Sequence, residues 1–417
     1  MIDLGDRTAY WMLLLYCFFM SLAAIIWKPL TDMIFIIMLI NCVFMYANEK
    51  KFEFEGFLIP LAAFFIYSLL TIIWSANRSY AISTNFSIAQ RVGLAICVYG
   101  IVDSKNRVEA IVKCFLLSGI FVLIYMLLNY GLGGILNFMA SESRARLGED
   151  ITSANTIGGA FSISAVAAWY FITRSEKKLL NLLLFSVFFL FVLASGSRAA
   201  FFGLIVGMMV CSFYSPKSGK IARLTVVIVI IFGLYETVKH FNLMPGVISR
   251  FDEALASIFG NAEISGSAKS RVEFAEYGFS KIVQNPIFGY GAGQFRYYMG
   301  LDKGMPYSAH NNYVEVLFSY GIVGGALWYG MFIYCITKLW KPGQHPENAA
   351  VIALLMMRMV SDIAGHSIAT SRPYLFLALA FACIKIEESE TQSVRLEEIE
   401  ENANGRKSYI RANSPYR

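Results

Sequence analysis

Apolar runs of about 20 residues recur along the chain, and they constrain its fold more than any other feature. A run of this length, folded as a helix, crosses the roughly 30 Å of hydrocarbon in a bilayer. Of the 417 residues, 57% are hydrophobic and only 15% are charged, whereas soluble domains carry about 25% charged residues. The sequence therefore predicts an all-α polytopic membrane protein. Its net charge of +6 requires no nucleic-acid partner, because basic cytoplasmic loops account for it.

Hydropathy predicts about twelve transmembrane helices. They are expected near residues 8–27, 31–47, 57–75, 85–102, 108–129, 157–173, 178–196, 198–215, 221–240, 312–338, 347–366 and 372–386. The fourth and the last two are short or polar, so ten or eleven remain open. The seven cysteines all fall inside these spans without metal-ligand spacing, so we expect neither disulfides nor a metal site.

The spans and loops divide the chain into four parts. Residues 1–240 hold the first nine spans and a short outer loop at 130–157, and residues 241–311 form a long loop. Residues 312–386 hold the last three spans, and residues 387–417 form a charged tail that is expected to begin as a solvated helix. Helical spacing at 251–255 and 271–283, and turn signals at 285–286 and 289–293, predict that the long loop is a partly helical cap.

Basic residues predict the orientation of the chain, because cytoplasmic loops are enriched in Lys and Arg. One set of short loops carries Lys50, Lys51, Lys105, Arg107, Arg174, Lys177, Lys178, Lys217, Lys220, Arg223, Lys338 and Lys341. The alternate set carries Lys28, Arg78, Arg144, Arg146, Arg198 and Arg372, which is half as many. Both termini are therefore expected in the cytoplasm, and the long loop with His310 is expected outside.

His310 is the first candidate for a catalytic group. It lies where the long polar loop meets an apolar helix, in a chain with only four histidines. A neutral imidazole can accept a proton from a hydroxyl near pH 7. The surroundings do not indicate a metal ligand or a hydrolase triad, since they contain no HExxH and no GxSxG motif.

Arginines near the predicted outer boundary are the second signal. Arg198 joins two apolar spans in the sequence Ser195-Gly196-Ser197-Arg198, and Arg91 lies inside the fourth span. Charges at such depth are costly unless they face a polar cavity, and guanidinium groups match phosphate oxygens in pairs. Two alternatives remain open. The side chain of Arg91 could extend to the membrane–water interface, and Arg198 could serve only to set the orientation of the chain in the membrane.

Arg358, Asp362 and His366 are spaced at i, i+4 and i+8, which predicts that they share one helical face. Two interpretations remain open for this face. Arg358 and Asp362 could form an internal ion pair that only neutralises a buried arginine, or they could support the reaction site. Arg144, Arg146 and Asn155 lie in the short outer loop, where ordinary loop solvation is the default.

Three features together resemble the O-antigen ligase and polymerase superfamily of bacterial envelope glycan enzymes. They are the junction Ser195–Arg198; Arg271 followed by Asn285-Pro286-Ile287-Phe288-Gly289-Tyr290-Gly291; and His310-Asn311 followed after nine residues by Gly321 and Gly324. The similarity spans most of residues 140–330. Asn155 resembles a family asparagine, although Ala154 stands where a proline often precedes it.

The resemblance implies a glycosyltransferase in the bacterial inner membrane, with its active site facing the periplasm. The donor would be a glycan on undecaprenyl diphosphate, and no metal or other cofactor would be needed. His310 would correspond to the essential histidine. Arg198 and Arg271 would hold the diphosphate. On the residues themselves, Arg91 is a further candidate cation for the diphosphate, and Asn155, Asn311, Arg358 and Asp362 are candidates for supporting the site.

Several functions remain open at this stage. The acceptor would be lipid A–core sugar in a ligase, or a second lipid-linked repeat unit in a polymerase, and the histidine motif is shared by both. A transporter or flippase would also explain the spans and the intramembrane charges. A scaffold subunit of an export machine would use the long loop for docking. The ordered loop that ends in a membrane-proximal histidine favours an enzyme over a transporter. The fit of His310-Asn311, Gly321 and Gly324 to the ligase signature favours an inverting, metal-independent ligase.

Overall fold

The computed structural model describes residues 2–23, 29–48, 58–141, 146–174, 177–214, 267–341 and 345–412, with isolated positions between 25 and 56 and between 225 and 252. Every regular element within these residues is helical. The helices are α1 (Ile2–Ala23), α2 (Pro29–Asn48), α3 (Leu58–Leu70), the 3-10 helix η1 (Thr71–Ile73), α4 (Arg78–Ile101), α5 (Lys105–Ala140), α6 (Ala154–Arg174), α7 (Lys178–Ala194), α8 (Arg198–Tyr214), α11 (Ser267–Ile282), α12 (Gln294–Lys303), α13 (Asn312–Leu339), α14 (Asn348–Asp362) and α15 (Ser371–Ala412).

Five of the described helices are long and apolar enough to cross a membrane: Pro29–Ala47, Arg78–Ile101, Lys105–Ala140, Ala154–Arg174 and Asn312–Leu339. Three shorter apolar helices cover Leu58–Ile73, Lys178–Ala194 and Arg198–Tyr214. Large apolar side chains on α2, such as Ile36 and Phe44, are exposed, as expected where lipid covers the surface. The chain is thus a multi-pass helical membrane protein. Most of the predicted span 221–240 lies outside the described residues, so the number twelve is not established.

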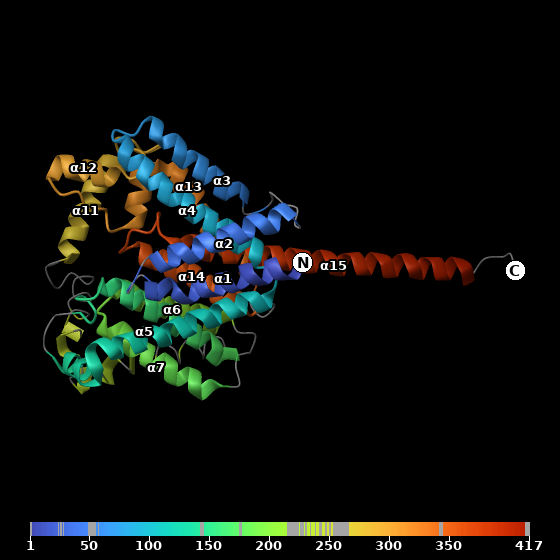
Figure 1. Cartoon of the computed structure of the whole chain (residues 1–417), viewed down its shortest axis with the longest axis horizontal. Coiled ribbons are helices and arrows are strands. Elements are labelled where there is room, and N and C mark those ends of the chain that lie inside the picture. The colour runs from blue at the N-terminus through green and yellow to red at the C-terminus, as the bar shows by residue number, and fades with distance from the viewer. Residues whose placement is uncertain are drawn as a thin grey trace.

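The helices pack into a bundle around one continuous apolar core. Helix α6 packs against α5, α7 and α8, while α14 packs between α8 and α15. Helices α3, α4 and α13 form a second group, which α15 joins to the first through its contacts with α4 and α13. In Figure 1, α11 and α12 lie at one end of the bundle and α15 projects from the opposite end.

The part of the long loop that follows residue 266 is folded onto the start of α13. Helices α11 and α12 both contact α13, and they share a small apolar core with it. That core consists of Phe274, Phe295, Met299, Ala309, Val314 and Phe318. Helix α11 confirms the helix predicted at 271–283, whereas the predicted helical segment 251–255 lies almost wholly outside the described residues. This separate core explains why the segment before His310 can hold a defined geometry.

Gly321 interrupts α13 and lets the preceding loop approach its backbone. The backbone of Gly321 has φ 62° and ψ −165°, a conformation that is open mainly to glycine. At this break, the amides of Ile322 and Val323 donate to the carbonyls of Pro286 (2.8 Å) and Ile287 (3.2 Å). On the same stretch, the amide of Tyr290 donates to the Phe318 carbonyl (2.8 Å). The motif at residues 285–291 and the motif at residues 310–324 therefore form one structural unit.

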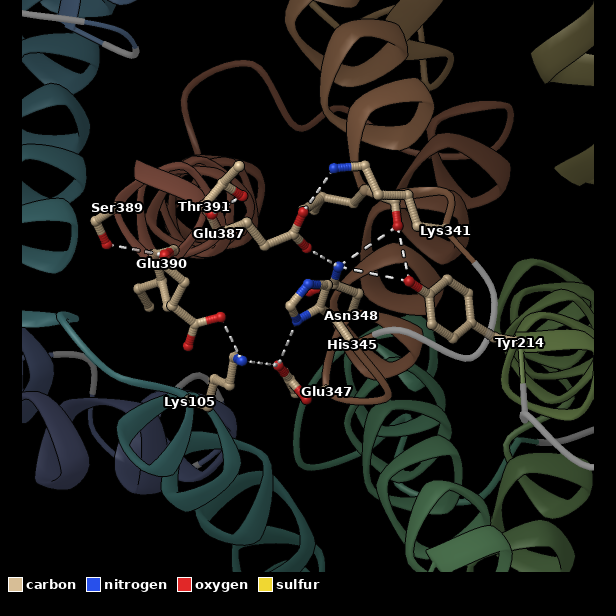
Figure 2. A network of polar contacts seen from close by, with 12 residues as sticks. Lys105, Tyr214, Lys341, His345, Glu347, Asn348, Glu387, Ser389, Glu390 and Thr391 are labelled. Atoms are coloured by element: carbon tan, nitrogen blue, oxygen red, sulfur yellow. Dashed lines mark hydrogen bonds and ion pairs between the residues drawn. The ribbon is translucent and has the colours of Figure 1, made fainter. Parts of the chain in front are cut away.

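A polar network fixes α15 at the end of the bundle opposite α11 and α12 (Figure 2). The buried Glu387 accepts from the side-chain amide of Asn348 and pairs with Lys341 at 2.9 Å. Lys105 pairs with Glu390 at 2.6 Å and lies 3.9 Å from Glu347. Lys105 and Lys341 belong to the loops predicted to be cytoplasmic. Beyond this network, α15 continues to Ala412, so the predicted helix in the tail is confirmed as a direct extension of the last apolar segment.

We predict that Gly321→Ala destabilises the protein strongly. A Cβ at Gly321 would lie 2.2 Å from the Ile287 carbonyl oxygen and 2.7 Å from the Phe288 amide nitrogen. Backbone strain at positive φ adds to this overlap, so the loss is expected at about 2–5 kcal/mol. Thermal unfolding of the purified protein in detergent measures it.

Gly330→Ala is the matched control in the same helix, because a Cβ at Gly330 has no atom within 4 Å. Alanine is the better helix former by about 1 kcal/mol, so this variant should unfold at the wild-type temperature or slightly above it. Equal melting temperatures for the two alanine variants would contradict the close approach of the loop to Gly321.

Candidate active site

His310 is held in a strained backbone conformation directly before α13. Its φ of 50° lies in the left-handed region, which costs a residue with a Cβ about 1–2 kcal/mol. The next residue, Asn311, caps α13, because its side-chain oxygen accepts from the amides of Tyr313 (3.0 Å) and Val314 (3.2 Å). Asn311 therefore positions the histidine through the helix start. The strain indicates that the surroundings fix His310 in place.

Two further contacts fix the position of His310. The buried carboxylate of Glu315, which is 3% exposed, accepts the amide hydrogen of Ala309 at 2.9 Å. The imidazole of His310 stacks on Phe274 of α11, with 6.1 Å between ring centroids and 22° between planes. Despite this contact, His310 as a residue is exposed to solvent. His310 thus combines a fixed position with access from solvent.

Arg271 links His310 to Arg198. The partial burial of His310 against α11 and the positive charge of Arg271 together lower the pKa of the imidazole below its usual value of about 6.5. Burial and the charge of Arg198 lower the pKa of Arg271 in turn. Arg271 is therefore within electrostatic range of both other residues. His310, Arg271 and Arg198 are therefore linked electrostatically through Arg271, and the lowered pKa of His310 favours the neutral imidazole at pH 7.

Arg91, Asn155 and Arg358 lie in a second group, around a cavity of about 510 Å³. The cavity is bounded by α1, α2, α4, α6, α8, α14 and α15. His310, Arg198 and Arg271 are not among the residues that line it, although Ser197 and Ala199 on either side of Arg198 are. The side chain of Arg372 also lines the cavity. The helix that carries Arg91 begins at Arg78 rather than near residue 85, so Arg91 lies well inside it.

Asp362 is the centre of a buried polar network beside this cavity. Its carboxylate accepts from Arg358 Nε (2.8 Å), the Ser367 hydroxyl (2.6 Å), Asn312 Nδ2 (3.2 Å) and the Tyr329 hydroxyl (3.1 Å). The predicted pair of Arg358 and Asp362 is confirmed. Since Asn312 is the first residue of α13, this network connects the helix that follows His310 to the end of α14.

The expectation that His366 shares a helical face with Arg358 and Asp362 is wrong. Helix α14 ends at Asp362, because Asn312 Oδ1 accepts the amides of Ser367 (2.8 Å) and Ile368 (2.9 Å) and holds the chain in turns. His366 instead lines the cavity, and its Nδ1 lies 3.5 Å from Glu315 Oε2. Through Glu315, His366 is connected to the backbone that carries His310.

Asn155 is oriented by the short outer loop. Arg146 donates to Asn155 Oδ1 at 2.7 Å and to the Ser195 carbonyl at 3.1 Å. The loop is thereby tied to the junction that carries Arg198. Arg144 lies outside the described residues.

Sequence reasoning missed three residues around the site. Glu315 lies in the first turn of an apolar helix, where a lone carboxylate is a usable sequence signal. Asn312 is an ordinary helix-start residue by sequence, so its contacts with Asp362 could not be expected. Arg372 was used only for topology, and its position after Thr370-Ser371 gave no indication of the cavity.

Comparison with known proteins supports the resemblance that the sequence indicated. Residues 182–329 match the family described as O-Antigen ligase, a stretch that includes Arg198, Arg271, His310 and Glu315. Over 367 residues the chain is 21% identical to the teichuronic acid biosynthesis protein TuaE of Bacillus subtilis (strain 168), covering 80% of this chain and 72% of that protein. The resemblance to the O-antigen ligase and polymerase superfamily that the sequence indicated is thus confirmed.

Proposed function

We propose that the protein transfers a glycan from undecaprenyl diphosphate to a hydroxyl of an acceptor sugar. The observation that carries this proposal is the fixed, neutral imidazole of His310 within electrostatic range of Arg271, which in turn lies within range of Arg198. A neutral base beside a pair of permanent cations suits a reaction that removes a proton and releases a diphosphate. A transporter would have no comparable use for a strained, solvent-exposed histidine.

In the proposed reaction, the acceptor hydroxyl oxygen attacks C1 of the donor sugar. A new C1–O bond forms on the face opposite the diphosphate, while the bond from C1 to the diphosphate oxygen breaks, so the anomeric configuration inverts. The hydroxyl proton passes to His310, and the electron pair of the broken bond stays on the lipid diphosphate. Arg198 and Arg271 stabilise the growing negative charge, with Arg91 as a further cation. Because these charges are permanent, the scheme needs no metal.

The supporting residues act through position rather than through contact with the reacting atoms. Asn311 caps α13, and Glu315 holds the backbone before His310. Asp362 joins α13 to α14 and neutralises Arg358, while Arg146 orients Asn155 beside the cavity. We place the site at the periplasmic face of the inner membrane, with both termini in the cytoplasm, because the basic loops cluster at the opposite end of the bundle.

The acceptor defines two candidate functions. We favour a ligase with a lipid A–core acceptor, on the fit of His310-Asn311 and Gly321 to the ligase motif. The second candidate is a polymerase that extends a lipid-linked repeat unit. It is supported by the similarity to a protein named for teichuronic acid biosynthesis, since building a glycan is the polymerase reaction.

We predict that His310→Ala lowers the transfer rate by about 10²–10⁴-fold, the usual contribution of a general base. The measurement is transfer of a labelled glycan by purified protein at pH 7.5, with membrane level and melting temperature checked against wild type. His240→Ala is the control, because His240 is exposed and lies outside the groups described above. Transfer by His310→Ala at the native rate would refute the role of the base.

We predict that Arg271→Gln moves the acid limb of the rate profile to higher pH. Protonation of His310 stops the reaction, so the rate falls as pH drops through a pKa below 6.5. His366 and Arg296 also lower this pKa and Glu315 raises it. Removing the positive charge of Arg271 stabilises the imidazolium form of His310 and raises its pKa. Arg271→Lys keeps the positive charge, so the acid limb of its rate profile should stay near the wild-type position. A limb that does not move in Arg271→Gln would contradict the coupling.

Deletion of the gene distinguishes the ligase from the polymerase. If the protein is a ligase, we expect lipid A–core without glycan and polymer accumulating on the lipid carrier. If it is a polymerase, we expect single repeat units on the final acceptor. The measurement is gel analysis of envelope glycans with complementation by the wild-type gene. An unchanged glycan profile would contradict both candidates.

A further inference from the structure

Residues 282–295 form an uncharged stretch that runs from the end of α11 to the start of α12. They include no acidic or basic residue, whereas Lys281 precedes them and Arg296 follows them. The stretch is shorter than the roughly 20 residues that a transmembrane helix needs, and uncharged segments of this length are found as re-entrant or interfacial segments. It contains the motif at residues 285–291, which has no part in the proposed transfer reaction.

The backbone of this stretch is hydrogen-bonded to α3, η1 and α13. The Tyr67 hydroxyl of α3 is shared between the carbonyl oxygens of Tyr320 (2.8 Å) and Phe288 (3.1 Å). The amide of Ala292 donates to the Thr71 hydroxyl of η1 at 3.0 Å. These bonds add to those that join the loop to the break in α13. Irregular backbone at membrane depth is tolerated where its polar groups have partners of this kind.

Apolar side chains of the same stretch are exposed, in contrast to its bonded backbone. Val283 is 79% exposed, Ile287 54% and Phe288 58%. The Phe288 ring makes a T-shaped contact with the ring of Trp74, at 6.4 Å between centroids. Trp74 and its neighbour Ile73 are also exposed, at 40% and 70%. Adjoining apolar side chains on a protein surface indicate a partner that covers them.

The exposed residues continue the outward face of α3. Ile66, Leu70 and Ile73 are all exposed, and their spacing of i, i+4 and i+7 places them on one side of the helix. Lipid tails cover such a face on an apolar helix of a membrane protein. Trp74 follows at the end of this face, and tryptophan is enriched at the level of the lipid headgroups. The contact between Trp74 and Phe288 therefore carries the lipid-facing surface from α3 onto the loop.

Gly289 lets the loop lie directly against α13. Its φ is 70°, and a Cβ at this position would lie 2.6 Å from the Gly321 amide nitrogen and 2.7 Å from the Phe318 carbonyl oxygen. The loop thus fills the break in α13 with backbone alone. The side chains of Ile287 and Phe288 remain on the exposed side.

We propose that a loop surface, formed by Val283, Ile287 and Phe288 with Ile73 and Trp74, is embedded in the bilayer leaflet nearest α11 and α12. The partner is the lipid itself, because the surface continues the lipid-facing side of α3 and its backbone has the internal bonds that hydrocarbon requires. The loop is bonded to α13, which begins directly after the Asn311 cap, so the embedded loop fixes the height of the preceding histidine above the bilayer. The contact does not depend on which glycan or acceptor the protein uses.

The test is the accessibility of a nitroxide spin label on one introduced cysteine, in the full chain in nanodiscs of phosphatidylethanolamine and phosphatidylglycerol. The label collides with oxygen, which dissolves in lipid, or with a nickel chelate, which stays in water. We expect the ratio of oxygen to nickel collisions to be several-fold higher in Phe288→Cys than in Leu301→Cys. Wild-type protein labelled in parallel corrects for the native cysteines, which are buried except for the partly buried Cys114.

Leu301→Cys is the matched control, because Leu301 of α12 is an apolar residue of similar exposure, 63%, that is followed by two charged residues. Ile73→Cys provides the ratio for a position at the end of an apolar helix, and Phe288→Cys should match it. Ile287→Cys is the second variant in case Phe288→Cys does not fold, and it should give the same high ratio.

Three results would overturn the proposal. The first is a ratio at positions 287 and 288 as low as that of Leu301→Cys, which would place the loop in water. The second is poor access of both reagents, which would mean that protein covers the surface. The third is dipolar broadening between labels, which would identify a second copy of the chain as the occupant. No substrate is present in this measurement, so its outcome is independent of the transfer assay with His310→Ala.

Discussion

The cost of a charge inside an apolar bundle is the constraint on which the site depends. Asp362 is completely buried, and it is tolerated because four donors from α13, α14 and the following turns satisfy it. Breaking a buried ion pair typically costs about 3–5 kcal/mol. The requirement to satisfy this carboxylate therefore joins the start of α13 to the end of α14, and so fixes the helix that carries His310 relative to the cavity.

The buried carboxylate of Glu315 is a second such charge: it accepts the Ala309 amide hydrogen and lies 3.5 Å from His366 Nδ1. Glu315 acts from inside α13 on the residues that precede it, while Asn311 caps the helix from outside. The stacked ring of Phe274 adds a contact from α11. Three contacts, two from α13 with its cap and one from α11, therefore hold one strained residue, which is how a protein keeps a reactive group in an otherwise unfavourable conformation.

Sequence reasoning reached the helical class and most helix positions. It singled out His310 and Arg198, to which the resemblance added Arg271. Helices α7 and α8 begin at Lys178 and Arg198, as predicted, because long apolar runs between basic or small residues leave little choice. The expectation that His366 lies on the face of Asp362 assumed a regular helix as far as residue 366, whereas α14 ends at Asp362. Neither the start of α4 at its Asn77 cap nor the turns after Asp362 can be read from hydropathy.

The sequence by itself determined that the chain enters the membrane repeatedly and that a histidine and several arginines lie at the ends of its helices. These properties are local, because they depend on hydrophobic runs and on the cost of charge within them. Only the tertiary structure decided which cations share a space. Arg91, Arg358 and Arg372 are far apart in the chain, and they meet because α4, α14 and α15 pack together, whereas Arg271 is carried to His310 by the folding of α11 on α13.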